Sequence, residues 1–185
     1  RDQGELLAGQ KVLINGASGG VGTYAVQIAK ALGAEVHGVC STRNVDMVRS
    51  IGADHVYDYK QEDYTASGEQ YDLIIDNVGN HSPLDNTRVI KPDGRYVEVG
   101  GPKGDWIGPM IGSVKRFFTA PFVSQELRGL MARLDAADLA LLAELMASGQ
   151  MRSVIDQRYP LHETAAAIAY SETGRVRGKI VIEVL

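Results

Sequence analysis

A glycine-rich turn near the start of the chain has the residue types and the spacing that bind a phosphate group. Six residues form it: Ala17, Ser18, Gly19, Gly20, Val21 and Gly22. Glycines allow a sharp turn and a close approach of the backbone to a ligand, and a helix N-terminus offers unpaired N–H groups to phosphate oxygens. We expect Gly20 to approach a pyrophosphate and Gly22 to let the helix pack closely on a sheet. The apolar run before the turn and the helical pattern after it favour a dinucleotide-binding turn over a tight turn without a ligand.

The elements that position this turn alternate along the sequence between strands and helices. We expect strands at residues 12–14, 35–40, 55–59, 71–78 and 95–99, and helices at 24–32, 44–51 and 83–90, with Gly33 ending the first helix. Such alternation is typical of a parallel sheet with both faces covered. The sequence therefore predicts the α/β class, as a Rossmann-type doubly wound parallel sheet with helices on both faces.

The second half of the chain has a different pattern. Residues 101–121 are rich in glycine and proline and then carry an aromatic pair, which predicts a loop and a short helix over a site. Residues 124–146 are rich in leucine and predict a helical region broken near 135–138. A strand at 153–159, a helix at 162–171 and a strand at 179–185 are expected to follow.

Composition excludes several classes of protein. The 185 residues carry a net charge of −4 without a block of Lys or Arg, which argues against a nucleic-acid surface. No apolar stretch approaches the roughly 20 residues of a membrane span. Cys40 is the one cysteine, so neither a disulfide framework nor a cysteine-based zinc site is expected, and the four histidines lack metal-ligand spacing. These features predict a cytoplasmic protein without a metal.

The end of the second predicted strand indicates which nicotinamide cofactor is preferred. NAD-binding Rossmann domains place an Asp or Glu about 20 residues after the glycine turn, where it binds the ribose 2′-OH. Here that position reads Val39-Cys40-Ser41-Thr42-Arg43, without a carboxylate. A guanidinium can instead pair with a 2′-phosphate. The sequence therefore predicts NADPH, with Ser41 and Arg43 at the 2′-phosphate.

Motifs spread over the whole chain are those of one known family. They lie at residues 15–22, 40–44, 52–54, 58–59, 71–72, 76–79, 99–100 and 178–181. With them the chain resembles the medium-chain dehydrogenase/reductase superfamily, specifically its zinc-independent quinone oxidoreductase branch. Within that branch it is similar to the chloroplast-envelope quinone oxidoreductase homologues and their bacterial relatives.

The resemblance implies further contacts with the cofactor. It places Tyr59 beside the adenosine phosphate. It places the stretch Asn77, Val78 and Gly79 against the nicotinamide ribose, and Val99 and Gly100 near the nicotinamide amide. Asn77 to Gly79 also end a predicted strand at the carboxyl edge, where open α/β sheets bind ligands. Asp76, just before them, is expected to brace the strand end rather than to act in catalysis.

The resemblance also implies a reaction. NADPH would give a hydride to a quinone or an α,β-unsaturated carbonyl, and the chain offers no residue to which we assign a catalytic role. Members of the family begin with a GroES-like catalytic domain, so we expect this chain to be the nucleotide-binding half, without turnover by itself. Residues 1–150 would form the NADP(H)-binding domain. Residues 151–185 would form a strand–helix–strand segment that completes the sheet or returns toward the GroES-like domain.

Other functions stay open at this point. The chain could be an NADPH-binding sensor without activity, or the enoyl-reductase part of a multidomain synthase, and a homodimer is open as well. A short-chain dehydrogenase is disfavoured because none of the eight tyrosines has a lysine four residues after it.

Overall fold

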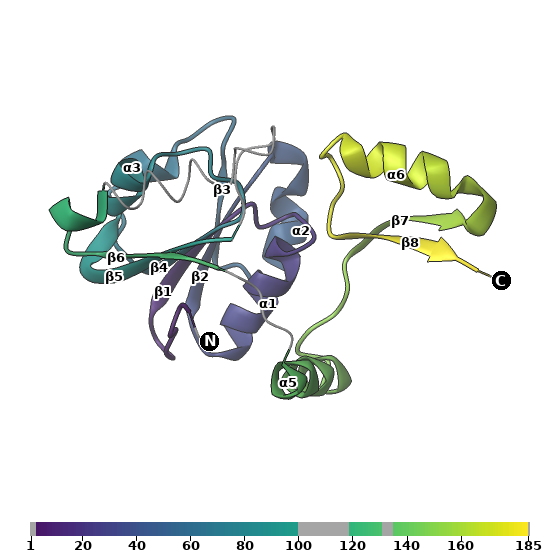
Figure 1. Ribbon diagram of the computed structural model, residues 1–185, viewed down its shortest axis with the longest axis horizontal. Helices are drawn as coiled ribbons and strands as arrows, with labels where there is room; N and C mark the ends of the chain where they lie inside the picture. The colour runs from purple at the N-terminus through teal and green to yellow at the C-terminus, as the bar shows by residue number, and fades with distance from the viewer. Residues whose placement is uncertain (1–2, 100–118, 131–134, 185) are drawn as a thin grey trace.

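Six parallel strands form the central sheet of the computed structural model, which describes residues 3–99, 119–130 and 135–184 (Figure 1). They are β1 (Lys11–Asn15), β2 (Glu35–Cys40), β3 (His55–Asp58), β4 (Tyr71–Asp76), β5 (Ile90–Glu98) and β6 (Glu126–Gly129). Their order is β3-β2-β1-β4-β5-β6, and every pairing is parallel. This is the doubly wound order, so the predicted fold class is confirmed. The strand order reverses between β1 and β4.

Helices cover both faces of the sheet. Helices α1 (Gly22–Ala31) and α2 (Val45–Ser50) lie on one face, and α3 (Pro83–Thr87) and the 3₁₀ turn η2 (Tyr64–Ala66) lie on the other (Figure 1). Because side chains alternate along a strand, Val12 and Ile14 pack with α1 and α2, whereas Leu13 packs on the opposite face. Helix α1 ends where predicted, since Gly33 adopts a φ of 81° directly after the last helical turn.

Two predicted helices were wrong in part. The helix expected at 83–90 is the short α3, and Ile90 already begins β5. Residues 126–129 form the strand β6 and not a helix, because they pair with β5 from Arg95–Glu126 to Glu98–Gly129. Strand pairing with β5 outweighs the helical propensity of a leucine-containing segment. The loop expected at 101–121 lies mostly outside the described residues.

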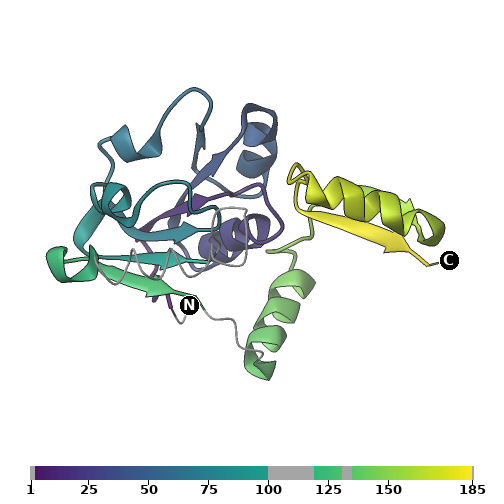
Figure 2. The same cartoon turned by 45° about the horizontal axis from the view of Figure 1, so that its top comes forward.

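The last part of the chain forms a separate unit beside α1 and α2 (Figures 1 and 2). It contains α5 (Ala136–Ala147), β7 (Ile155–Pro160), α6 (Thr164–Glu172) and β8 (Lys179–Glu183). β7 and β8 pair in parallel with each other and do not extend the six-stranded sheet. Of the two expected courses of this segment, completion of the sheet was wrong, and a return toward a GroES-like domain stays a prediction. The chain is attached to α1 instead, where the buried Gln27 side chain bonds both backbone groups of Arg152, at 3.0 and 2.8 Å.

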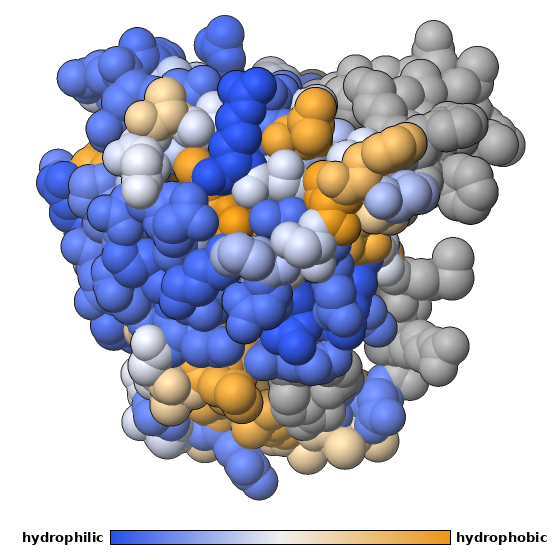
Figure 3. Space-filling model, turned by 90° about the vertical axis from the view of Figure 1, so that its left-hand side faces the viewer, coloured by the Kyte–Doolittle hydropathy of each residue, from blue (hydrophilic) through white to orange (hydrophobic). Residues whose placement is uncertain are grey.

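The face next to α3 and β6 is mostly polar. Figure 3 shows this face, on which hydrophilic side chains dominate and apolar side chains form separate groups. The exposed apolar residues of this region include Leu84 of α3 and Phe122. Strand β6 is one of the two edge strands of the described sheet, and β3 is the other. In the described ranges, no helix is long and apolar enough to cross a membrane.

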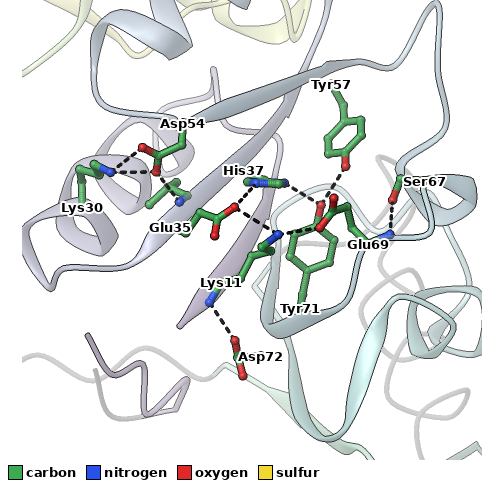
Figure 4. Close-up of polar contacts among 11 residues, drawn as sticks. Lys11, Lys30, Glu35, His37, Asp54, Tyr57, Ser67, Glu69, Tyr71 and Asp72 are labelled. Carbon is green, nitrogen blue, oxygen red and sulfur yellow. Dashed lines mark hydrogen bonds and ion pairs between the residues drawn. The ribbon is translucent and has the colours of Figure 1, made fainter. Parts of the chain in front are cut away.

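A polar network ties together the amino ends of four strands, at the edge opposite to the glycine turn (Figure 4). The Lys11 ammonium contacts Glu69 at 2.6 Å and Glu35 at 3.1 Å. The His37 ring is buried and lies between Glu35, 3.0 Å from Nε2, and the Tyr71 hydroxyl, 2.9 Å from Nδ1. Burial lowers the pKa of His37, despite the opposing effect of Glu35.

We predict that His37 makes the fold sensitive to mild acid. Its pKa is lowered in the folded state, so below the ordinary histidine pKa of about 6.5 the unfolded chain binds a proton more readily than the folded chain, and stability falls. The drop in Tm between pH 7.5 and pH 5.5 should be smaller for His37→Gln than for the wild type. His162→Gln, at an exposed position, is the control and should keep the wild-type drop. An unchanged pH dependence in His37→Gln would contradict this role.

Candidate functional site

The glycine turn is folded tightly against the ends of β1 and β2. Gly16 has a φ of 78°, and its N–H and that of Ala17 both donate to the Val39 carbonyl, at 3.2 and 3.0 Å. A Cβ on Gly22 would lie 2.1 Å from the Gly16 carbonyl oxygen, a distance that no side chain can occupy. The predicted packing role of Gly22 is therefore confirmed. Helix α1 can begin here only with a bare backbone.

The N-terminus of α1 has unused hydrogen-bond donors. Within the described part of the chain, the backbone N–H groups of Gly20, Val21 and Gly22 donate to no protein group. Val21 gives no side-chain cap, and the first turn of the helix contains no acidic residue. Free donors and the positive end of the helix dipole therefore meet at the same point, which suits an anion.

A buried asparagine joins this turn to the end of β2. Asn44 lies in a short 3₁₀ turn before α2, and its side-chain amide donates to the hydroxyls of Ser18, at 3.0 Å, and Ser41, at 3.2 Å. Two predicted site residues from different elements thus lie together. The side-chain oxygen of Asn44, Oδ1, is buried without a partner among the described residues. Sequence reasoning missed Asn44, although an asparagine at a helix start three residues after Ser41 was a usable signal.

Arg43 and Tyr59 lie near the same corner of the site. Both side chains are exposed, and Arg43 donates through Nη2 to the backbone carbonyl of Arg175. Tyr59 directly follows β3, and its N–H donates to the Cys40 carbonyl at 3.1 Å. The structure therefore places Ser41, Arg43 and Tyr59 around the carboxyl ends of β2 and β3.

One carboxylate does lie beside the end of β2, on the neighbouring strand. Asp58 is the register partner of Cys40, a proximity that reading along β2 alone does not show. Its oxygens accept from the Lys60 N–H at 3.1 Å and from Gln61 at 2.6 Å. A hydrogen bond with Thr42 is the main cause that holds the pKa of Asp58 below its usual value. The carboxylate of Asp58 is thus held by Thr42 and by the loop after β3.

Asp76 organises the loop after β4. It is fully buried, and its Oδ1 accepts from Asn15 and from the N–H groups of Val78 and Gly79, each at 2.9 Å. Its Oδ2 accepts from the Tyr96 hydroxyl at 2.8 Å. All of these bonds are structural, so the prediction that Asp76 braces the strand end is confirmed.

The bracing holds the loop after β4 against the glycine turn. Asn77 bonds the Asn15 carbonyl through its N–H and its Nδ2, while its Oδ1 is buried without a partner. A Cγ atom of Val78 lies 2.8 Å from the point where Gly16 would carry a Cβ. Val99 donates its N–H to the Asp76 carbonyl at 2.8 Å, and Gly100 lies outside the described residues. Every described residue of the predicted site therefore lies at the carboxyl edge of the sheet.

The C-terminal unit brings two residues next to the glycine turn to which the sequence analysis gave no role in the site. A Cβ on Gly20 would lie 3.1 Å from the Gly178 carbonyl oxygen and 3.1 Å from the Lys179 ammonium. The start of β8 therefore approaches Gly20 closely from one side. The described residues contain no group of three or more potential metal ligands, so we assign no step to a metal.

Comparisons with known proteins agree with this geometry. Residues 51–182 match a family model described as zinc-binding dehydrogenase. The chain is 34% identical to the trans-enoyl reductase pgmF of Aspergillus terreus, covering 96% of this chain and 52% of that protein. It is also 34% identical to the human mitochondrial NAD(P)H oxidoreductase RTN4IP1, covering 96% and 48%.

A solved structure matches the fold as well. The quinone oxidoreductase from Coxiella burnetii superposes with a TM-score of 0.85 at 29% identity, covering all of this chain and 56% of that one. The chain thus spans about half the length of the relatives that it matches.

We predict different effects of alanine at two glycines of the turn. Gly22→Ala forces a Cβ against a backbone oxygen and should lower the free energy of unfolding by about 3 kcal/mol, the upper end for overpacking. Gly19→Ala meets only the Gly16 oxygen at 3.4 Å and should cost less than about 1 kcal/mol. Urea unfolding of both variants tests this. Equal stability of Gly22→Ala and wild type would refute the packing role of Gly22.

Proposed function

The chain belongs to the zinc-binding dehydrogenase family of the medium-chain dehydrogenase/reductase superfamily, and we propose that it is the NADPH-binding part of an oxidoreductase that reduces a quinone or an enone. The observation that carries the proposal is the uncapped N-terminus of α1 behind a glycine turn, at the point where the strand order reverses. The printed functions of the relatives support the class of reaction. For the 185-residue chain by itself we propose cofactor binding with little turnover.

The pyrophosphate would lie at the start of α1. The N–H groups of Gly20, Val21 and Gly22 are free to donate to its oxygens, together with the dipole of the helix. Ser18 adds a hydroxyl that already accepts a bond from Asn44, so its own proton is available to a phosphate oxygen. The turn thus offers donors and no competing acceptor side chain.

The 2′-phosphate of NADPH would lie at the end of β2. Ser41 and Arg43 supply a hydroxyl and a guanidinium there, and Tyr59 supplies an exposed ring on the neighbouring strand end. The carboxylate of Asp58 is held by Thr42, Lys60 and Gln61. The guanidinium of Arg43 has more donors than its one bond to Arg175 uses. These features favour NADPH over NADH.

The nicotinamide would lie at the loops after β4 and β5. Asn77, Val78 and Gly79 would contact its ribose, and Val99 and Gly100 its amide. The unpartnered Oδ1 of Asn77 is an acceptor for a ribose hydroxyl. When bound, the cofactor supplies the hydride, and the described residues position it and shield one side of it.

Three further expectations remain proposals. A small-molecule substrate follows from the proposed reaction. A cytoplasmic location and a homodimer rest on the sequence alone, and the human relative carries the name of a mitochondrial protein.

We predict that Arg43→Ala weakens the binding of NADPH by roughly 10- to 100-fold, the equivalent of a lost hydrogen bond to a charged group, about 1.5–3 kcal/mol. NADH lacks the 2′-phosphate, so its affinity should stay within about 2-fold of wild type. Isothermal titration calorimetry measures both. Arg88→Ala, which removes an exposed arginine after α3, is the matched control. Equal affinity of the wild type for NADPH and NADH would rule out the proposed preference.

A further inference from the structure

Asn44 does not use its side chain as an asparagine at the start of a helix ordinarily does. It is the N-cap residue of α2, a position where an asparagine oxygen usually accepts a hydrogen bond from the first helical turn. Here the side chain makes no such bond. Its Nδ2 donates instead to Ser18 Oγ, at 3.0 Å, and to Ser41 Oγ, at 3.2 Å. Asn44 therefore links two other elements and leaves α2 without a side-chain cap.

This arrangement is unfavourable for the stability of the protein alone. Asn44 is only 5% exposed, and its Oδ1 has no partner among the described residues. A buried polar atom without a partner lowers stability, and a capping bond would have used this oxygen. The stability of α2 therefore does not explain where the side chain of Asn44 lies.

The amide of Asn44 fixes the direction of two hydroxyl protons. Nδ2 carries two protons and accepts none, so each serine turns a lone pair toward it and its own proton away. An amide turned the other way would leave two N–H groups at the point where Oδ1 has no partner. In the described part of the chain, no protein group accepts the proton of either hydroxyl. Both protons are thus available to a ligand.

The two hydroxyls lie at two different ends of the candidate site. Ser18 belongs to the glycine turn before α1, and Ser41 directly follows β2. Both residues are partly buried, so a ligand can reach them. In the proposed function these are the places of the pyrophosphate and the 2′-phosphate. A phosphate oxygen is a charged acceptor, to which a hydroxyl that already points at it donates strongly.

We propose that Asn44 is a positioning residue for the cofactor, which directs the protons of Ser18 and Ser41 to the two phosphate sites. The inference rests on the proposed function and deepens it, because one buried side chain then serves both sites. Asn44 acts through the two serines and not by a contact of its own. NADPH uses both hydroxyls, whereas NADH lacks the 2′-phosphate and uses Ser18 alone.

The test measures Asn44→Ala in two backgrounds by calorimetric titration with NADPH and with NADH. In the otherwise wild-type chain, the affinity should fall by about 10-fold for NADPH and by about 3-fold for NADH, part of a hydrogen bond to a charged group at each serine. In the background of Ser18→Ala and Ser41→Ala together, Asn44→Ala should change either affinity by less than about 2-fold, because the groups through which it acts are gone.

A second variant guards against the cavity that alanine would leave. Asn44→Asp keeps the volume of the side chain, but its carboxylate accepts the protons of both hydroxyls, so the affinity for NADPH should fall at least as far as in Asn44→Ala. Tyr71→Phe is the control for a lost buried hydrogen bond. It removes a hydroxyl that lies 2.9 Å from His37 Nδ1 and 3.0 Å from the Tyr57 hydroxyl, at the opposite edge of the sheet (Figure 4). Both cofactors should bind to it as to the wild type.

Three outcomes would overturn the role of Asn44. They are wild-type affinity of Asn44→Ala, wild-type affinity of Asn44→Asp, and an equal loss from Asn44→Ala with and without the two serines. The last result would assign Asn44 a direct contact or a purely structural role. Failure of the wild type to bind either cofactor would instead overturn the proposed function.

Discussion

The contact between Gly22 and the carbonyl oxygen of Gly16 leaves no room for a side chain, and the rest of the site depends on it. Because α1 begins this close to the end of β1, its first N–H groups have neither a backbone partner nor a side-chain cap. An uncapped helix N-terminus lowers the stability of a protein without a ligand, because its N–H groups lack acceptors. The same N–H groups favour the binding of an anion. An anion bound at this turn, as we propose, would satisfy these N–H groups.

Buried polar side chains hold the loops around this turn in place. Asp76 accepts two hydrogen bonds from the loop after β4 and one each from Asn15 of β1 and Tyr96 of β5, and Asn44 joins the hydroxyls of Ser18 and Ser41. Both residues are nearly or fully buried, so the loss of one of these bonds would leave an unsatisfied polar group in the protein interior. The segments that would contact the two ends of the cofactor are thereby rigid. The start of β8 belongs to the same arrangement, since Gly178 attaches it to Ser18.

Local patterns in the sequence predicted most of the fold and the conformation of the glycine turn, whereas its role in binding stays a prediction. The strands from β1 to β5, the turn and the end of α1 at Gly33 are each signalled by residues next to each other in the chain. Strand β6 was missed because its structure depends on pairing with β5, and Asp58 was missed because it approaches Cys40 only through the register of β3. Lys179 lies more than 150 residues after Gly20, so only the folded chain shows that they meet. Contacts between distant segments carry no periodic signal in the sequence.

The central claim is that the turn at the start of α1 binds the phosphates of NADPH. Hydrogen–deuterium exchange of the chain with and without saturating NADPH tests it most directly, because the free N–H groups of Gly20, Val21 and Gly22 are themselves the reporters. The account predicts slower exchange at residues 18–24 and 41–44 and no change around His37, at the opposite edge of the sheet. Unchanged exchange at residues 18–24 in the presence of bound NADPH would contradict it.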